Sequence, residues 1–376
     1  MMFVATQDWL FAARHLPLVR AARELGLDPV VVASDHGQRR AVEEAGARFM
    51  PLDWPRQGRS PAALRHQIEA LKRIMLSQRP PIVQFQGMRA AVSGLVAARL
   101  AGMPRCIAAF SGLGHSAVQA GVAGDMTRMM LRAVVAMALK GGPVHAVFDN
   151  PDDPRLLGLD PAQSLQVHIM PGHGVDPLVH TPEAMPWAPP LKLVFGSPLL
   201  WANGPDLAVE ATRKARAQGA YVSLSLIGTA YGASKHAVPG ETLLAWSRLP
   251  GVSWFGPTPD IAQVWRQHHV LILPSRGGDG LPPILAQAAA AARPVITSDA
   301  DGCGSFVRDG IDGRVVPRGN VASLAEAIML MSRAPGLVER MGRAGREKVL
   351  DGYTERKVME SFKALWRRML AVDNAA

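Results

Sequence analysis

The chain has 376 residues, of which 48% are hydrophobic and 19% charged, so it can bury sizeable cores and its composition excludes global disorder. Two cysteines are too few for a disulfide framework or a thiolate zinc site, which fits a reducing, cytoplasmic compartment. Lysine and arginine total 41 against 31 acidic residues, and only eight of them are lysine. The net charge of +10 is therefore mostly guanidinium and favours phosphate-bearing or acidic partners.

The apolar segments are too short to cross a membrane. The longest runs, such as 133–139, stop well short of the roughly 18 to 20 residues that a bilayer requires. The stretch 1–8 reaches polar residues after about six positions and has no basic leader, so we expect a buried first strand at 2–6 rather than a secretory signal.

Short apolar runs alternate with helical stretches along the whole chain, the pattern of βαβ units on a parallel sheet. In the first half the expected strands are 2–6, 29–33, 81–85, 106–110 and 144–149, and the helices are 16–25, 39–45, 62–77, 90–101 and 126–140. In the second half the expected strands are 191–195, 221–227, 254–255, 270–273 and 294–298, and the helices are 206–218, 281–292 and 354–371.

The segment 182–190 contains four prolines and no periodicity, so we interpret it as a linker between two doubly wound α/β halves. This places an N-terminal domain at 1–181 and a C-terminal domain at 190–351. Two such domains joined by a hinge create a cleft between them, which is a common place for a ligand.

The most informative segment runs from 252 to 317 and includes Gly278-Asp-Gly-Leu-Pro282 directly before an apolar helix. The order and spacing of its pieces resemble the C-terminal domain of retaining glycosyltransferases of family 4, which have the GT-B architecture of two Rossmann-like domains. The N-terminal half is similar to bacterial polysaccharide-type members at 8–18, 111–114 and 170–176. The resemblance covers nearly the whole chain, and six pieces in register are far more specific than any one of them.

This resemblance implies an enzyme of the hexosyltransferase type that moves a sugar from a nucleotide diphosphate donor to a polysaccharide or lipid-linked acceptor. It also implies retention of the anomeric configuration, and a final helix at 352–372 that packs back on the first domain. The nucleotide-sugar is then a co-substrate, and we expect no other cofactor and no metal.

The loop 278–282 has a physical reason to bind an anion. Its glycines allow close backbone approach, and the amides of a following helical turn, together with the positive end of the helix dipole, attract a pyrophosphate. Alternatively, Asp279 caps the helix with Pro282 in its first turn, an arrangement that needs no ligand.

The candidate site residues follow from these motifs and from the resemblance. Those expected to be catalytic are Asp279, Arg276 and Ser111. Those expected to bind the donor are Gly256, Pro257, Gly278, Gly280, Leu281, Pro282, Gln287 and Asn203. Those expected on the acceptor side are Trp9, His15, His115 and His173.

Several positions depart from the family pattern. Asp279 and Gln287 stand where the family has two glutamates, Ser305 where it usually has a glutamate, and Ser111 where several members have a histidine. Pro198 and Asn203 replace the arginine and lysine that neutralise the leaving diphosphate, and charge stabilisation of this kind is often the largest catalytic contribution.

Arg276 and Lys235 are possible replacements for the missing cations. The departures leave a second hypothesis open: a catalytically impaired GT-B protein that serves as a binding or assembly partner of an active glycosyltransferase. A GT-B enzyme of another kind, such as a nucleotide-sugar epimerase, is a third.

The sequence also bears on nucleic-acid binding and membrane binding. Scattered basic residues and only three tyrosines argue against a nucleic-acid-binding surface. The segment 128–140 combines a methionine-rich apolar face with three basic residues, so it is either a core helix or a helix that lies on an anionic membrane. We therefore keep a peripheral position on the inner membrane face as an expectation.

Overall fold

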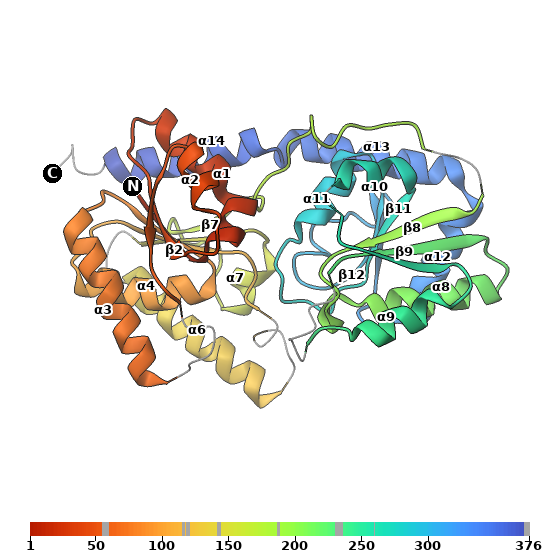
Figure 1. Ribbon diagram of the computed structural model, residues 1–376, viewed down its shortest axis with the longest axis horizontal. Helices are drawn as coiled ribbons and strands as arrows, with labels where there is room; N and C mark the ends of the chain where they lie inside the picture. Colours follow the sequence, from red (N-terminus) through yellow and green to blue (C-terminus); the bar gives the residue numbers. More distant parts are fainter. Residues whose placement is uncertain are drawn as a thin grey trace. The chain divides into compact units, whose positions relative to one another are not determined.

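The computed structural model describes residues 1–54, 60–114, 117, 121–140, 144–185, 189–229, 236–258 and 260–371. The chain divides into two compact units: unit 1 comprises Met1–His173 and Glu355–Ala376, and unit 2 comprises Gly174–Thr354. Each unit is built on a parallel sheet flanked by helices (Figure 1), which confirms the prediction of two doubly wound α/β domains.

Unit 1 contains a seven-stranded sheet of order β3-β2-β1-β4-β5-β6-β7. Its strands are β1 (Met2–Gln7), β2 (Val30–Ser34), β3 (Arg48–Pro51), β4 (Val83–Gln86), β5 (Cys106–Phe110), β6 (Val144–Phe148) and β7 (Val167–Ile169). Its helices are α1 (Asp8–Glu24), α2 (Arg39–Glu44), α3 (Pro61–Gln78), α4 (Met88–Leu100), α6 (Val122–Lys140), α7 (Asp152–Leu156) and α14 (Glu355–Ala371). The strand order reverses between β1 and β4, the switch point at which ligands bind to such sheets.

Alternation along β1 explains why both faces of the unit 1 sheet are covered. Met2 and Val4 contribute to a core with residues of α3, α4 and α6, whereas Phe3 contributes to a second core with residues of α1 and α14. Successive side chains of a strand point to opposite faces, so a continuous apolar strand needs helices on both sides.

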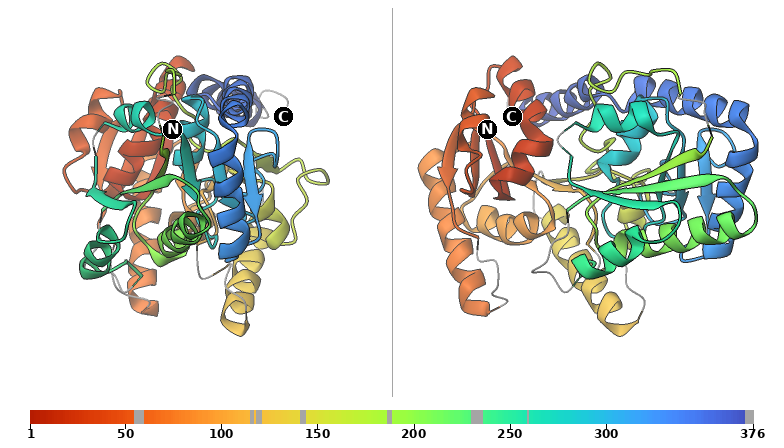
Figure 2. Two further views of the ribbon diagram at one scale, coloured as in Figure 1. Left: turned by 90° about the vertical axis from the view of Figure 1, so that its right-hand side faces the viewer. Right: turned by 45° about the vertical axis from the view of Figure 1, so that its right-hand side comes forward.

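The C-terminal helix α14 returns to unit 1 and packs beside α1 (Figure 2). Trp366 is fully buried in this core, stacks edge-on against Phe3, and donates its indole N–H to Gln84 Oε1 at 3.0 Å. Ion pairs between Arg20 and Glu355 and between Lys363 and Glu24 join the rims of the two helices.

Unit 2 contains a six-stranded sheet of order β10-β9-β8-β11-β12-β13. Its strands are β8 (Leu191–Gly196), β9 (Val222–Ile227), β10 (Val252–Gly256), β11 (Val270–Leu273), β12 (Val295–Ser298) and β13 (Gly313–Val316). Its helices are the 3-10 turn η1 (Trp201–Asn203), α8 (Pro205–Ala217), α9 (Gly240–Ser247), α10 (Ile261–Gln267), α11 (Pro283–Ala290), α12 (Val321–Arg333) and α13 (Pro335–Gly352). The switch point lies between β8 and β11.

Two boundaries differ from the sequence-based ones. The first helix begins at Asp8 rather than at residue 16, with Pro17 inside it, so the proline does not mark a helix start. The division between the units falls after His173, and the proline-rich segment 182–190 therefore belongs to unit 2. There the carbonyl of Glu183 accepts a hydrogen bond from the buried Arg293.

Within the described residues, no single helix is long and apolar enough to cross a membrane; only α12 and α13 taken together, bent by 105° at their junction, pass by length and composition.

Candidate functional site

The predicted donor loop of unit 2 lies at the switch point of its sheet. It connects β11 to α11, and the neighbouring loop from β8 to α8 carries Pro198 and Asn203. In open α/β sheets ligands bind outside the carboxyl ends of the strands at this point. The topology therefore brings together Asp279, Gly280 and Asn203 from loops that are far apart in the sequence.

Close backbone packing shapes the donor loop. Gly278 has a φ of 102°, in the region that favours glycine. A Cβ on Gly302 would lie 2.0 Å from the carbonyl oxygen of Gly280, so the turn after β12 touches the loop directly. These glycines are needed for the loop to reach its conformation with or without a ligand.

The first turn of α11 offers fewer amides than the sequence suggested. The helix begins at Pro283 with Pro282 as its N-cap residue, and neither proline has an N–H. The N–H of Leu285 donates to the carbonyl of Pro282 at 3.0 Å. The expectation of several free first-turn amides is therefore wrong. The two prolines have no N–H and that of Leu285 is bonded, so the first turn has only the N–H of Ile284 left to offer.

Arg276 makes a bidentate ion pair with Asp206 of α8, with nitrogen–oxygen distances of 2.9 and 2.7 Å. Its guanidinium also donates to the carbonyl of Trp201, and its backbone N–H donates to the carbonyl of Ala202 at 2.6 Å. Bidentate pairs of this kind fix geometry. Arg276 thus connects the two loops of the switch point, and its predicted catalytic role remains a prediction.

Asn203 is buried, and its amide donates to Ser197 Oγ and to the carbonyl of Pro198, both at 2.9 Å. Both amide hydrogens therefore hold the loop in which the family places its cations. Asp279 and Gln287 are each half-buried, and Gln287 lies on α11. Their predicted contacts with a donor stay predictions, as do those of the other donor residues.

The positions of the remaining candidate residues say less about a ligand site. Gly256 ends β10 and is half-buried, and Pro257 is exposed. His115 and Lys235 lie outside the described residues. Burial raises the pKa of the Cys303 thiol to about 12, so it is protonated at neutral pH. Among the residues that the structure describes, no three His, Cys, Asp or Glu side chains are grouped to hold a metal ion.

In unit 1, a pocket lies at the carboxyl ends of β4 to β7 and is lined by residues of α1 and α14. It brings together Ser111, His15 and His173, three of the predicted site residues. Trp9 is not part of its lining; it is about half exposed after β1 and donates its indole N–H to Gln7 Oε1 at 2.8 Å.

The two histidines form an edge-to-face pair with ring centroids 4.8 Å apart. Burial, and secondarily the nearby Arg14, lowers the pKa of His15 to about 3. Burial, and then the His15 and Arg14 charges, holds the pKa of His173 well below its usual range. Both rings are therefore neutral at physiological pH, and the buried Nε2 of His173 has no hydrogen-bond partner in the described part of the chain.

Two pocket residues were missed at the sequence level as site candidates. Gln86 ends β4, is 7% exposed, and its buried amide nitrogen has no hydrogen-bond partner among the described residues. Asp149 follows β6, and Asn150 holds it by donating to its Oδ1 at 2.9 Å. Their position in the sequence could have indicated them as site residues, because both stand where a strand of a parallel sheet ends.

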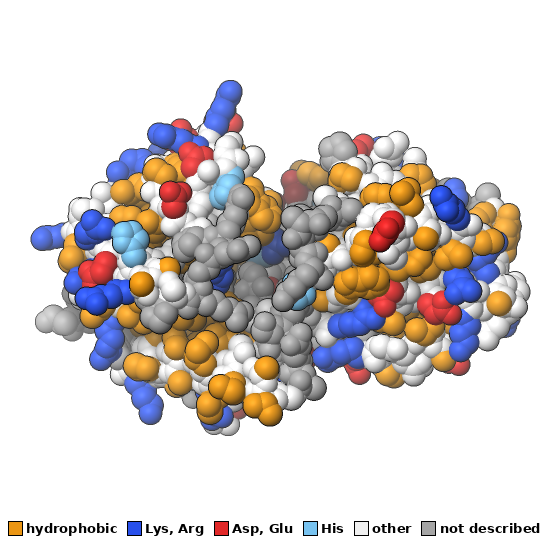
Figure 3. All heavy atoms as spheres, turned by 60° about the horizontal axis from the view of Figure 1, so that its bottom comes forward, with side chains coloured by type: hydrophobic (Ala, Val, Ile, Leu, Met, Phe, Trp, Pro, Cys, Tyr) orange, Lys and Arg blue, Asp and Glu red, His pale blue; other side chains and the backbone are white. Residues whose placement is uncertain are grey.

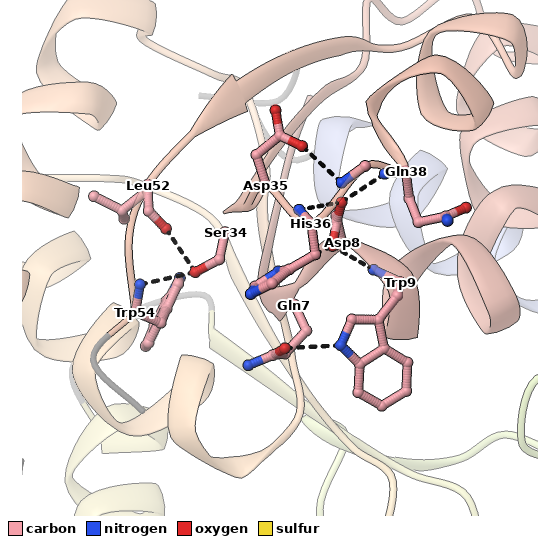
Figure 4. A network of polar contacts seen from close by, with 10 residues as sticks. Gln7, Asp8, Trp9, Ser34, Asp35, His36, Gln38, Leu52 and Trp54 are labelled. Carbon is pink, nitrogen blue, oxygen red and sulfur yellow. Dashed lines mark hydrogen bonds and ion pairs between the residues drawn. The ribbon is translucent and has the colours of Figure 1, made fainter. Parts of the chain in front are cut away.

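Asp8 organises the neighbouring loops rather than facing a ligand (Figure 4). Its fully buried carboxylate accepts hydrogen bonds from the backbone N–H groups of Trp9, His36 and Gln38 at 2.7 to 2.8 Å. Burial alone would raise the pKa of Asp8, but these bonds outweigh it and hold the pKa below its ordinary value. The charged carboxylate thus ties the loops after β1 and β2 together.

Comparison with known proteins accounts for both units. Residues 1–140 match the family model for glycosyl transferase 4-like domains, and residues 190–333 match the model for glycosyl transferases group 1. Together with the fold, these matches define the chain as a glycosyltransferase of the GT-B architecture, which confirms the predicted fold type.

Relatives differ in how much of the chain they share. The N,N'-diacetylbacillosaminyl-diphospho-undecaprenol alpha-1,3-N-acetylgalactosaminyltransferase of Campylobacter jejuni is 18% identical over 95% of both chains. The phosphatidyl-myo-inositol mannosyltransferase of Mycobacterium leprae is 39% identical over 88 residues, 23% of this chain. The match spans about a quarter of that relative's length.

Solved structures of similar fold cover almost the entire chain. Sucrose-phosphate synthase from Thermosynechococcus elongatus has a TM-score of 0.78 at 16% identity, over 99% of each chain. Anabaena HepE in complex with UDP has a TM-score of 0.76 at 14% identity, over 98% of this chain and 99% of its own. At these identities the likeness concerns the fold.

Proposed function

We propose that this protein transfers a hexosyl group from a nucleotide diphosphate donor to a polysaccharide or lipid-linked acceptor on the cytoplasmic side of the membrane, with retention of anomeric configuration. The observation that carries the proposal is the position of the candidate loops. In unit 2 they occupy the switch point of the sheet. In unit 1, a pocket lies at the carboxyl ends of the strands, and Gln86 and His173 in its lining have buried nitrogen atoms with no hydrogen-bond partner among the described residues.

Names of related proteins support this choice of substrates. The Campylobacter relative is named for an undecaprenol-linked acceptor, and HepE was solved with UDP-glucose as well as with UDP. In the proposed reaction the bond between the sugar C1 and the diphosphate oxygen breaks. A new bond from C1 to an acceptor oxygen forms, the acceptor hydroxyl loses its proton, and the nucleoside diphosphate leaves.

In this proposal each unit supplies one substrate. Asp279 and Gln287 contact the donor sugar and ribose, and the glycine-rich backbone around 278–281 and the Ile284 amide contact the diphosphate. In unit 1, the neutral His15–His173 pair, Ser111 and Gln86 offer hydrogen bonds to acceptor hydroxyl groups.

A reaction assay tests the activity. The protein is incubated with UDP- and GDP-sugars and an undecaprenyl-diphosphate-linked acceptor, and nucleotide release and glycosylated product are measured. We expect product whose first-formed anomer, identified by proton NMR, matches the donor. Asp279→Ala should lower turnover on the order of 100-fold. The matched control Asp351→Ala, an exposed aspartate of the same unit on α13, should leave it unchanged.

The ion pairing in unit 2 favours a second candidate, a catalytically impaired assembly partner. Pro198 and Asn203 carry no charge, and the Arg276 guanidinium is held by Asp206. A partner of this kind would bind nucleotide diphosphates weakly or not at all and release none from a sugar donor. Absence of turnover with every donor, together with capture of an active glycosyltransferase, would establish this alternative.

A further inference from the structure

Helix α6 has two apolar faces, and the core of unit 1 covers only one of them. Leu131 and Val135 are buried in the core shared with α4 and β6, and Gly124 is buried on the same face. At about 100° per residue, the residues on the opposite side form one stripe along the helix. Its members are Val122, Met126, Met129, Met130, Ala133 and Met137, and all are exposed.

The exposure of this stripe is unusual for side chains of this size. Its five large members are 57 to 76% exposed. Isolated exposed apolar residues are ordinary, but a contiguous row on one helix marks an interaction surface. Methionine adapts to irregular apolar surroundings, which suits a fluid partner. The view from the side of α3, α4 and α6 shows exposed hydrophobic side chains interspersed with basic ones there (Figure 3).

Charge decides which partner fits the stripe. Arg132 and Lys140 on α6 are exposed, while its one acidic residue, Asp125, is ion-paired with Arg128. Helices α3, α4 and α6 together contain eight lysine and arginine residues and two acidic residues. A second copy of this chain would bring the same positive charge to the contact, whereas an anionic lipid surface complements it.

We infer that the outward face of α6 docks on an anionic membrane surface. The stripe from Val122 to Met137 enters the boundary between headgroups and acyl chains, and Arg132 and Lys140 contact lipid phosphates. This inference goes beyond the transferase reaction and does not rest on it, because vesicle binding needs neither donor nor acceptor. Of the two sequence interpretations of this helix, the core interpretation holds for one face, and the membrane interpretation is our proposal for the other.

Vesicle flotation tests the inference. The purified full chain is mixed with vesicles of 30% phosphatidylglycerol in phosphatidylcholine, or of phosphatidylcholine alone. We expect binding to the anionic vesicles that weakens as salt is raised. Substituting four methionines (Met126→Gln, Met129→Gln, Met130→Gln and Met137→Gln) should weaken binding by more than about tenfold. Arg132→Gln and Lys140→Gln should each weaken it about fivefold.

Because the substituted side chains are exposed, the variants should fold, and thermal unfolding checks that they do. A control replaces three exposed leucines elsewhere, Leu165→Gln, Leu178→Gln and Leu244→Gln, and should bind as the wild type does. Equal vesicle binding by wild type and methionine variant would overturn the inference, as would no binding by the wild type. A dimer in sedimentation velocity that the methionine substitutions dissociate would also overturn it, because the stripe would then be a protein interface.

Discussion

The donor loop of unit 2 and the pocket of unit 1 differ in how much hydrogen-bonding capacity the chain itself uses. In unit 2, Arg276 donates to Asp206 at the start of α8, and Asn203 donates to residues of its own loop. In unit 1, Nε2 of Gln86 and Nε2 of His173 are buried without a hydrogen-bond partner among the residues that the structure describes. Buried polar groups normally find partners, and this is why we propose that the unit 1 pocket receives a ligand.

The contrast predicts that substitutions in the two regions have different effects. The donor loop is held in place before any ligand arrives, and substitutions there should act through loop geometry. The pocket contains buried polar atoms that do not stabilise the fold through hydrogen bonds, so substitutions there should lower ligand affinity without loss of stability. The following predictions test this contrast, from the largest expected effect to the smallest.

Trp366→Ala should destabilise unit 1 by about 3 to 5 kcal/mol, because it removes a fully buried indole that fills the core between α14 and the sheet. Hydrogen exchange with mass spectrometry would show faster exchange in β1, β4 and α1, with unit 2 unchanged. Trp9→Ala, which removes a half-exposed indole, is the control and should cost less than about 1 kcal/mol. Equal effects of the two would contradict the assignment of α14 to unit 1.

Acid should destabilise unit 1 through its neutral histidines. The pKa of His15 is about 3 when folded, against an ordinary value of 6.5. Between these values the unfolded chain binds a proton that the folded one does not, so stability falls as pH falls below 6.5. At pH 5 the loss from His15 alone is about 2 kcal/mol. His15→Gln should flatten the dependence of Tm on pH between 7 and 5.

The control for the acid experiment is His66→Gln, which alters an exposed histidine of α3. Its Tm should follow the wild-type pH dependence. If His15→Gln also retains the full wild-type slope, then His15 is not held neutral in the pocket.

Gln86→Leu should raise the acceptor KM about tenfold, because the ligand loses one hydrogen bond, while donor affinity stays unchanged. Tm should be unchanged or higher, since a buried amide without a partner is removed. Gln84→Leu is the matched control: it strands the Trp366 N–H, so it should lower Tm and leave the acceptor KM unchanged. A reversed result for the pair would place Gln86 in the structure and not in the site.

Arg276→Ala and Asp206→Ala should impair donor turnover by similar factors, about fivefold, and the double variant should be little worse than either. This non-additivity follows if the pair acts as one strap between the loops. Independent losses that multiply, with the larger loss in Arg276→Ala, would show instead that Arg276 contacts the leaving diphosphate.

The sequence predicted most of the central strands and the two parallel sheets, because strand period depends on local pattern, but it missed the edge strands β3, β7 and β13. Side-chain partners were not predictable in the same way. Arg276 meets Asp206 across 70 residues, and His15 meets His173 only because α1 and the loop after β7 line one pocket. The two prolines at 282 and 283 are evident in the sequence. That they remove N–H groups from the first turn of α11 depends on where the helix begins, which only the structure shows.

The most direct test of the account is a hydrogen-exchange footprint of the nucleotide on the full chain, taken with saturating UDP and, separately, GDP. The account predicts slower exchange at residues 277–287 of unit 2 for the nucleotide that is the donor's leaving group, and no change around Gln86, Ser111 and His173. Slower exchange confined to the unit 1 pocket, or none for either nucleotide, would contradict it.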